Sequence, residues 1–179
     1  MSKKVLIISS SPQRYGNSDT LCDEFAKGAK EAGHSVEKIF LRDYEVNYCL
    51  SCRACTTTAR CVQKDDAPEI LDKMLAADVI VLATPVYFYS MSAQLKTLID
   101  RTVPIYTQLT NKEFYFIITA ADDEQANVER VIDALRGFSD LCLEGTQERG
   151  IIYAMGVWKP GEVNSTKYME EAREMGGKI

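Results

Sequence analysis

Four cysteines lie within one short segment of the chain. Cys49, Cys52, Cys55 and Cys61 have two, two and five residues between successive members. Thiolates this close in sequence can converge on one metal ion or iron–sulfur cluster, and a Cys-x2-Cys-x2-Cys run is used by compact cluster sites. Structural zinc sites normally use two separated Cys-x2-Cys pairs, so zinc fits this spacing less well. A redox dithiol and purely structural thiols are the other interpretations.

A second candidate site is the hydroxyl-rich segment from Ser9 to Ser18, which follows an apolar run. Hydroxyls and free backbone N–H groups at the start of a helix attract anions, so this segment predicts a site for a phosphomonoester. It lacks the three spaced glycines of a dinucleotide-binding loop and the Gly-Lys-Ser/Thr of a Walker loop. An ordinary serine-rich turn, capped by Asn17 or Ser18, is the alternative.

A third candidate site contains a proline followed by aromatic residues, over Thr84–Tyr89. At the carboxyl end of a strand this segment could form a flat apolar wall for a planar ring, with backbone amides at the ring's polar edge. The alternative is that the aromatic side chains pack under a helix or form a subunit contact. Asp122 and Asp123, after a later apolar run, can cap the next helix, so we assign them no catalytic role.

The composition restricts the class of protein. The 179 residues, 46% of them hydrophobic, predict one domain over 1–179. The net charge is -5, and 21 basic residues are dispersed among 26 acidic ones, so we expect no nucleic-acid partner. No apolar run has the length of a signal peptide core or a membrane span, so we expect a cytoplasmic protein without disulfides or a membrane partner. The single histidine, His34, gives poor support to Ser-His-Asp catalysis.

The elements that must position these residues alternate along the chain. Ser35–Leu41 has the mixed pattern of an edge strand, and segments with helical spacing separate the strand-like runs. This order predicts a doubly wound α/β sandwich. The four cysteines lie in the long connection over about 42–64. The other strand-like runs, apolar or aromatic, are Val5–Ile8, Val79–Ala83, Phe114–Thr119 and Gly150–Ala154.

Several local features follow from the same patterns. Asp66, before Pro68 and Glu69, has the chemistry of a side-chain cap at a helix start. The last helix is expected over Val163–Met175. Trp158, in the segment Gly156–Gly161, is expected to pack against other side chains, and a position beside a ring in an adjoining subunit is the alternative. Buried positions are predicted for the small apolar side chains of Cys22 and Cys142 and for two helical faces, one with Leu21, Phe25, Ala29 and Ala32 and the other with Val128, Val131, Ile132 and Leu135.

The sequence resembles the NAD(P)H-dependent FMN reductase and iron–sulfur flavoprotein family of the flavodoxin-like superfamily. The family implies a three-layer α/β sandwich, with a five-stranded parallel sheet of order 2-1-3-4-5 and helices on both faces. Gln13 replaces an arginine that is usual in this family and so removes a cation from the phosphate site, which Arg14 is placed to replace. The matching motifs are Ser10-Ser11-Pro12-Gln13, Gly16-Asn17-Ser18, Thr84–Phe88, Leu95-Lys96 and Asp100-Arg101.

The resemblance also implies the cofactor sites. Relatives with similar cysteine spacing bind a 4Fe-4S cluster, which implies Cys49, Cys52, Cys55 and Cys61 as ligands, although similar loops occur in members described only as FMN reductases. The implied FMN-binding residues are Ser9, Ser11, Gln13, Asn17, Ser18, Thr84, Pro85, Val86, Tyr87, Phe88 and Thr119.

We therefore expect an FMN-dependent oxidoreductase that takes electrons from NAD(P)H and passes them to a small-molecule or protein acceptor. No catalytic side chain is assigned, because the flavin supplies the chemistry. One alternative is an iron–sulfur flavoprotein that relays electrons from a ferredoxin-like donor through a 4Fe-4S cluster. Others are a flavodoxin-like carrier without substrate turnover and a binding module without flavin. The family implies a homodimer or homotetramer.

Overall fold

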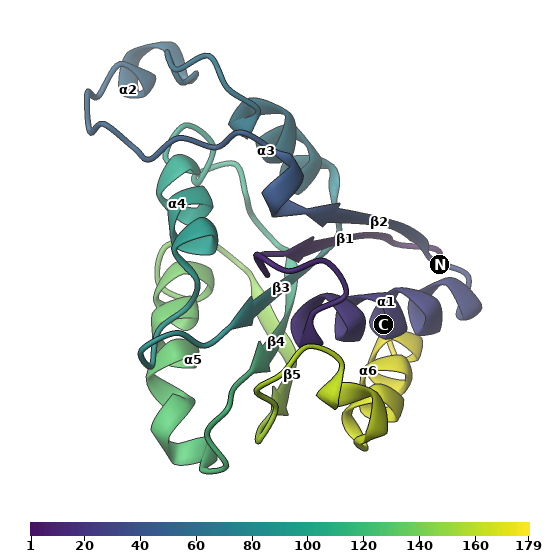
Figure 1. The fold of residues 1–179 in the computed structure, drawn as a ribbon. Helices are drawn as coiled ribbons and strands as arrows, with labels where there is room; N and C mark the ends of the chain where they lie inside the picture. Colours follow the sequence, from purple (N-terminus) through teal and green to yellow (C-terminus); the bar gives the residue numbers. More distant parts are fainter.

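A five-stranded parallel sheet forms the centre of the computed structural model, which describes all residues from Met1 to Ile179. The strands have the order β2-β1-β3-β4-β5, which confirms the predicted flavodoxin-like arrangement (Figure 1). Each strand-like run of the sequence is one of these strands. Their bounds are β1 Lys4–Ser9, β2 Ser35–Phe40, β3 Val79–Pro85, β4 Glu113–Thr119 and β5 Gln147–Ala154.

The helices lie on both faces of the sheet (Figure 1). One core cluster combines alternate residues of β1, β3 and β4 with apolar residues of α1 and α6, and the other combines the remaining strand residues with α3, α4 and α5. Strands covered on both faces must be apolar at every position, as β3 is, whereas β2 at the edge alternates. The bounds are α1 Asn17–Glu31, α2 Cys55–Thr58, α3 Ala67–Ala76, α4 Ala93–Arg101, α5 Gln125–Ser139 and α6 Tyr168–Gly177.

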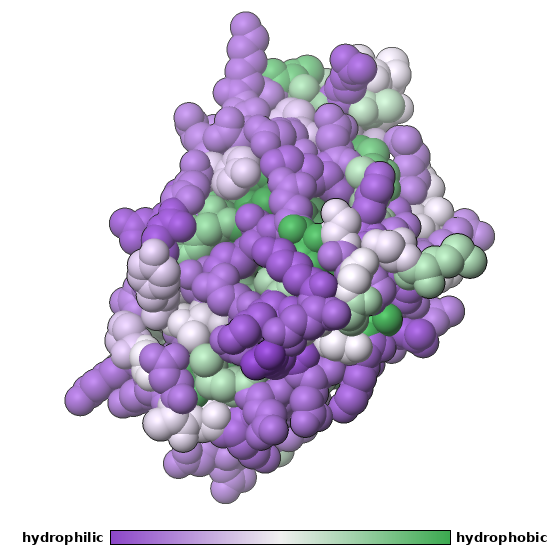
Figure 2. Space-filling view, turned by 90° about the vertical axis from the view of Figure 1, so that its right-hand side faces the viewer, coloured by the Kyte–Doolittle hydropathy of each residue, from purple (hydrophilic) through white to green (hydrophobic).

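Two glycines allow α1 and α6 to pack closely against each other. A Cβ atom at Gly28 would lie 1.9 Å from the carbonyl oxygen of Arg173, and one at Gly176 would lie 2.1 Å from the carbonyl oxygen of Phe25. The outward surface on this side of the molecule, where both chain ends lie, is mostly hydrophilic (Figure 2). The two helices therefore bury their apolar faces and leave polar faces to water.

The structure corrects five local predictions. Asp66 does not cap α3 with its side chain, because its carboxylate accepts a hydrogen bond from the Glu45 N–H at 2.7 Å. The predicted last helix is divided into a short 3-10 turn, Glu162–Ser165, and α6. Cys142 and Ala32 are exposed rather than buried, and Trp158 is 79% exposed. Cys22 is buried as predicted, and burial raises the pKa of its thiol.

The cysteine-containing connection extends away from the sheet beside α3 and α4 (Figure 1). It begins with a 3-10 turn, Leu41–Asp43, and its only α-helix is the short α2. Three residues in it, Ser51, Arg53 and Ala59, have positive φ angles of 52°, 61° and 54°. No helix of the chain has the length and apolar character needed to cross a membrane.

Candidate functional site

A cavity of about 350 Å³ lies at the carboxyl ends of the strands, where four loops meet. A site at this edge of a parallel sheet is the usual position for ligands in open α/β folds. Eight residues of the lining were predicted from the sequence: Ser11, Gln13, Asn17, Ser18, Pro85, Val86, Tyr87 and Thr119. The sequence analysis did not assign the other six: Gly16, Ala121, Val157, Trp158, Lys159 and Pro160.

The start of α1 faces this cavity with free hydrogen-bond donors. The backbone N–H groups of Asn17, Ser18 and Asp19 donate to no acceptor in the protein, and no side chain caps the helix. Unpaired amides at a helix N-terminus, together with the helix dipole, favour an anion. This end of the cavity can therefore hold a phosphate group.

Gly16 keeps the phosphate end of the cavity tight. A Cβ atom there would lie 3.0 Å from the Gln13 carbonyl oxygen and 3.1 Å from Ser11 Oγ. The φ angle of Gly16 is -69°, which any residue can adopt, so space and not backbone conformation requires glycine here. Ser11 Oγ in turn accepts a hydrogen bond from the Gln13 N–H at 3.1 Å, which closes the turn.

Asn17 joins the first loop to the loop after β5. Its Nδ2 donates to the Lys159 carbonyl oxygen at 3.0 Å, and its Oδ1 accepts from the N–H groups of Gly161 and Val163 at 3.1 and 3.2 Å. Ser18 Oγ makes a 2.6 Å hydrogen bond with Thr119 Oγ1. These two predicted side chains therefore hold neighbouring loops in place, while their backbone amides remain free for a ligand.

The loop after β3 forms one wall of the cavity. Val86 donates its N–H to the Thr119 carbonyl oxygen at 2.8 Å, and Tyr87 and Ser90 pair across a tight turn. The two residues within that turn, Phe88 and Tyr89, have positive φ angles of 48° and 57°. Burial raises the pKa of Tyr87, so its phenol stays protonated near neutral pH.

Three predicted flavin residues do not line the cavity. Ser9 is fully buried, and its Oγ has no hydrogen-bond partner. Thr84 is also buried, and its Oγ1 accepts a hydrogen bond from the Ser92 N–H at 2.9 Å, which fixes the loop to the start of α4. Phe88 is fully exposed at the tip of the turn. Their roles toward a ligand stay predictions.

The loop after β5 supplies the residues that sequence reasoning missed, including a cation. The Lys159 ammonium makes no hydrogen bond or ion pair within the chain and belongs to the cavity wall that contains Gln13 and Asn17. Arg14, expected to replace the missing arginine, instead pairs with Asp43, and its guanidinium carbon lies 4.4 Å from the Phe40 ring centroid. In the sequence these residues belong to the segment Gly156–Gly161, whose residue types alone do not indicate a binding site.

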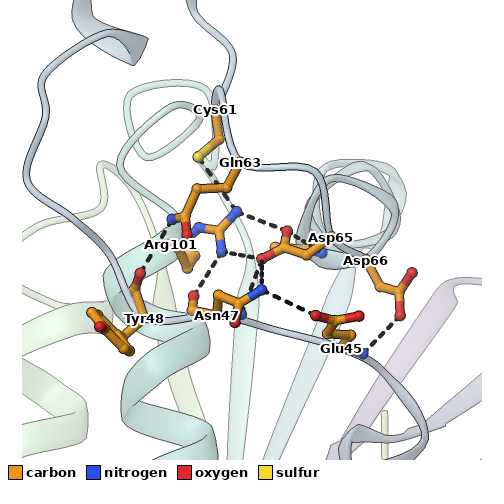
Figure 3. A network of polar contacts seen from close by, with 9 residues as sticks. Glu45, Asn47, Tyr48, Cys61, Gln63, Asp65, Asp66 and Arg101 are labelled. Carbon is orange, nitrogen blue, oxygen red and sulfur yellow. Dashed lines mark hydrogen bonds and ion pairs between the residues drawn. The ribbon is translucent and has the colours of Figure 1, made fainter.

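The four cysteines line a second, smaller cavity of about 110 Å³, between their loop and the end of α4. Cys49 Sγ accepts a hydrogen bond from the Ser51 N–H at 3.4 Å. Cys61 Sγ accepts one from Arg101 at 3.4 Å (Figure 3). In the described chain no three histidine, cysteine or acidic side chains come close enough together to hold a metal ion. The four thiols match the number and type of ligands in a metal centre, but in this structure they are not close enough together to bind one.

The chain is similar to known proteins over most of its length. A family model described as NADPH-dependent FMN reductase matches residues 3–140. An iron–sulfur flavoprotein of Archaeoglobus fulgidus is 31% identical over 180 residues, which cover 98% of this chain and 78% of that protein. An iron–sulfur flavoprotein of Methanocaldococcus jannaschii is 36% identical over 184 residues, which cover 98% of this chain and 95% of that protein.

Solved structures show the same fold. An NAD(P)H:quinone oxidoreductase from Methanothermobacter marburgensis superposes with a TM-score of 0.77 and 18% identity, covering 99% of this chain and 97% of that one. An azoreductase from Bacillus anthracis superposes with a TM-score of 0.75 and 17% identity over the full length of both chains. At these identities the likeness concerns the arrangement of strands and helices.

Proposed function

Because the chain belongs to the NADPH-dependent FMN reductase family, we propose that it binds FMN and transfers electrons from NAD(P)H to a small-molecule or protein acceptor. The observation that carries this proposal is the strand-end cavity, which combines an anion site with an aromatic wall. Its volume of about 350 Å³ lies in the range of small-molecule sites, roughly 300–1,000 Å³. The residues present therefore fit a flavin mononucleotide.

In this proposal the first loop binds the phosphate. The free N–H groups of Asn17, Ser18 and Asp19 donate to its oxygens, and the Lys159 ammonium adds the positive charge that Gln13 lacks. Gly16 allows the turn at Ser11 and Gln13 to close tightly beside these amides.

The other loops hold the ring system. Pro85, Val86 and Tyr87 supply an apolar surface on one side, and Trp158 supplies an aromatic surface on the cavity rim. FMN, when bound, supplies the redox chemistry by accepting a hydride and passing electrons on singly or in pairs. The chain binds and orients the reactants and excludes water, and we assign no side chain as an acid or base.

The test of this proposal is calorimetric titration of the folded protein with FMN and, separately, with riboflavin. We expect FMN to bind at least about tenfold more tightly than riboflavin, because charge-assisted hydrogen bonds to the phosphate contribute roughly 1.5–3 kcal/mol. The Gly16→Val variant should lose the preference for FMN, since its side chain would clash with the Gln13 carbonyl oxygen and Ser11 Oγ and distort the proposed phosphate loop, whereas Gly137→Val, with open space around it, should not. Absence of any heat with FMN would contradict the proposal.

Turnover separates a reductase from a carrier. The flavin-loaded protein should oxidise NADH or NADPH in the presence of an artificial acceptor, whereas a flavodoxin-like carrier would give no steady-state rate. Sedimentation of the same material measures the assembly, for which we propose a homodimer or homotetramer.

A second candidate function is that of an iron–sulfur flavoprotein fed by a ferredoxin-like donor. Two observations favour it: the four cysteines line one cavity, and the relatives matched over nearly the whole chain carry that name. Cys49, Cys52, Cys55 and Cys61 would be the ligands, and a cluster would supply one-electron transfer when bound. Counts of iron and acid-labile sulfide in anaerobically purified protein test this candidate, and flavin bands without iron would contradict it.

A further inference from the structure

Arg101, the last residue of α4, is a buried cation beside the cysteine loop. Only 2% of the residue is exposed, and its side chain forms an ion pair with Asp65, whose side chain is fully buried. The guanidinium donates to both carboxylate oxygens, at 2.5 and 2.9 Å. Burying two charges is unfavourable unless the geometry is good and further hydrogen bonds form, so the other contacts of this pair bear on its role.

Those further contacts all involve the two ends of the cysteine loop (Figure 3). Arg101 donates to the Asn47 carbonyl oxygen at 2.7 Å and to Cys61 Sγ at 3.4 Å. The Asp65 carboxylate accepts from the N–H groups of Asn47 and Ala67, at 3.0 and 3.3 Å. One ion pair therefore connects the start of the loop, its end and one of its four sulfurs to the end of α4.

The four cysteines differ in how they are held. Cys61 accepts a hydrogen bond from a buried side chain of the sheet-packed domain, and Cys49 accepts one only from the nearby Ser51 N–H. Cys52 and Cys55 accept no hydrogen bond at sulfur from the protein. Cys61 is therefore the sulfur whose position is determined from outside the loop.

Helix α4 also connects this loop to the strand-end cavity. Its N-cap, Ser92, lies two residues after the aromatic turn of Tyr87–Ser90, and the Ser92 N–H donates a hydrogen bond to Thr84 Oγ1. The last residue of the helix is Arg101. A helix of this length is rigid, so the placement of Cys61 relative to the cavity is set through α4.

We propose that Arg101, oriented by Asp65, is a positioning residue that fixes Cys61 and both ends of the cysteine loop against α4, so that a cluster bound by the loop has Cys61 as its fixed corner. The forked guanidinium is needed because one group must reach a carboxylate, a carbonyl oxygen and a sulfur at once, which a lysine ammonium on a flexible stem cannot do. The positioning itself requires only the chain, and the statement about a cluster rests on the second candidate function.

The first test needs neither flavin nor iron. We compare hydrogen–deuterium exchange of the Asn47 and Ala67 amides in the wild type, in Arg101→Lys and in Arg101→Gln. Arg60→Gln is the matched control, because Arg60 is an exposed arginine of the same loop whose side chain makes no hydrogen bond or ion pair. We expect exchange at both amides to be at least about tenfold faster in both Arg101 variants and unchanged in the control.

Arg101→Gln leaves the Asp65 carboxylate buried without a cation, which is strongly destabilising, so Arg101→Lys, which keeps a cation beside Asp65, decides the outcome. A thermal unfolding midpoint near that of the wild type, together with an unchanged far-UV circular dichroism spectrum, identifies a folded variant. Exchange at Asn47 and Ala67 no faster in folded Arg101→Lys than in Arg60→Gln would overturn the proposal. Because FMN binding is measured separately, its failure would count against the proposed function and not against this inference.

The second test reports on Cys61 itself. Each protein is reconstituted anaerobically with ferrous iron and sulfide, and the reduction potential of the iron chromophore is measured. An N–H donor to a ligating sulfur stabilises the more negative, reduced state, so we expect a lower potential in Arg101→Lys than in Arg60→Gln. A general loosening of the loop would reduce the iron content without this directed shift, and equal potentials at full iron content would overturn the role assigned to Cys61.

Discussion

Lys159 is the cation that we propose for the phosphate site in place of the arginine expected at position 13. Gln13 stands at the position where relatives are expected to have an arginine. Arg14 forms an ion pair with Asp43 and lies over the Phe40 ring. The ammonium that remains free at the cavity comes from a residue about 145 positions further along the chain, on the loop after β5. The proposed phosphate site thus combines two segments that are distant in sequence.

This assignment predicts a phosphate-specific defect in Lys159→Gln. We expect its affinity for FMN to fall about five- to tenfold, because roughly 1–1.4 kcal/mol of charge-assisted interaction is lost, while riboflavin binds as before. Lys159→Arg should retain the FMN affinity. Lys30→Gln, which removes an exposed lysine at the far end of α1, is the control. An equal loss for both ligands in Lys159→Gln would show that the residue acts on the ring and not on the phosphate.

The Arg101–Asp65 pair predicts a distinct dependence of stability on pH. The hydrogen bond from Arg101 lowers the pKa of Asp65 to about 2, below the value of about 3.9 in an unfolded chain. A depressed carboxyl pKa stabilises the folded state above the unfolded value, and that stabilisation, about 2 kcal/mol, is lost as the pH falls from about 4 to 2.

Urea unfolding at about pH 7 and at about pH 3.5 checks this expectation. Asp65→Asn should be less stable than the wild type near neutral pH and should lose less of its stability on acidification. Asp72→Asn, at an exposed carboxylate without a hydrogen-bond partner, is the matched control. A pH dependence of Asp65→Asn identical to that of the wild type would rule out this residue as the source.

At the scale of elements, the two glycines between α1 and α6 predict an unusual pattern of stability. Alanine normally favours a helix over glycine by about 1 kcal/mol. Gly137→Ala in α5, where nothing lies within 4 Å of the new methyl group, should therefore stabilise the protein by about 0.5–1 kcal/mol. Gly28→Ala and Gly176→Ala should destabilise it by about 2 kcal/mol or more, because each methyl group meets a carbonyl oxygen. Urea unfolding of the three variants provides the measurement, and stabilisation by Gly176→Ala would contradict the close packing.

The elements also show what the sequence could and could not predict. Apolar or aromatic runs placed four of the strands, because parallel strands buried on both faces have few polar positions, and the mixed pattern of Ser35–Leu41 indicated the edge strand β2. The phosphate loop and the aromatic turn were found because each directly follows such a strand. Trp158 and Lys159 were not predicted as residues of this cavity. The hydrogen bonds from Asn17 to Lys159 and Gly161 that hold their loop beside the first loop form only in the folded protein.

Arg101 illustrates a second limit. The Asp100-Arg101 dipeptide is visible in the sequence, but nothing in its spacing indicates a contact with Asp65 or Cys61, which lie 36 and 40 positions away. The failure of the predicted Asp66 cap has the same cause. Both aspartates at the end of the loop accept hydrogen bonds from backbone N–H groups at its start, Asp66 from Glu45 and Asp65 from Asn47.

At the scale of the whole molecule, FMN should stabilise the fold as a unit. A ligand present at about one hundred times its Kd stabilises the protein that binds it by about 2.7 kcal/mol. For a chain of this size that corresponds to a rise of about 5–10 °C in the unfolding midpoint. Differential scanning calorimetry with increasing FMN tests this expectation, with riboflavin at equal concentration as the comparison. A midpoint that does not change with FMN concentration would contradict binding to the folded state.

The bonds from Asn17 to Lys159, Gly161 and Val163 have a consequence for the order of events during biosynthesis. A chain that leaves the ribosome from its N-terminus presents the first loop long before residues 157–163 have been translated. Half-made chains thus have the amides of the anion site but neither the lysine nor the far wall, and we expect nascent polypeptide to take up its nucleotide only after these last segments emerge.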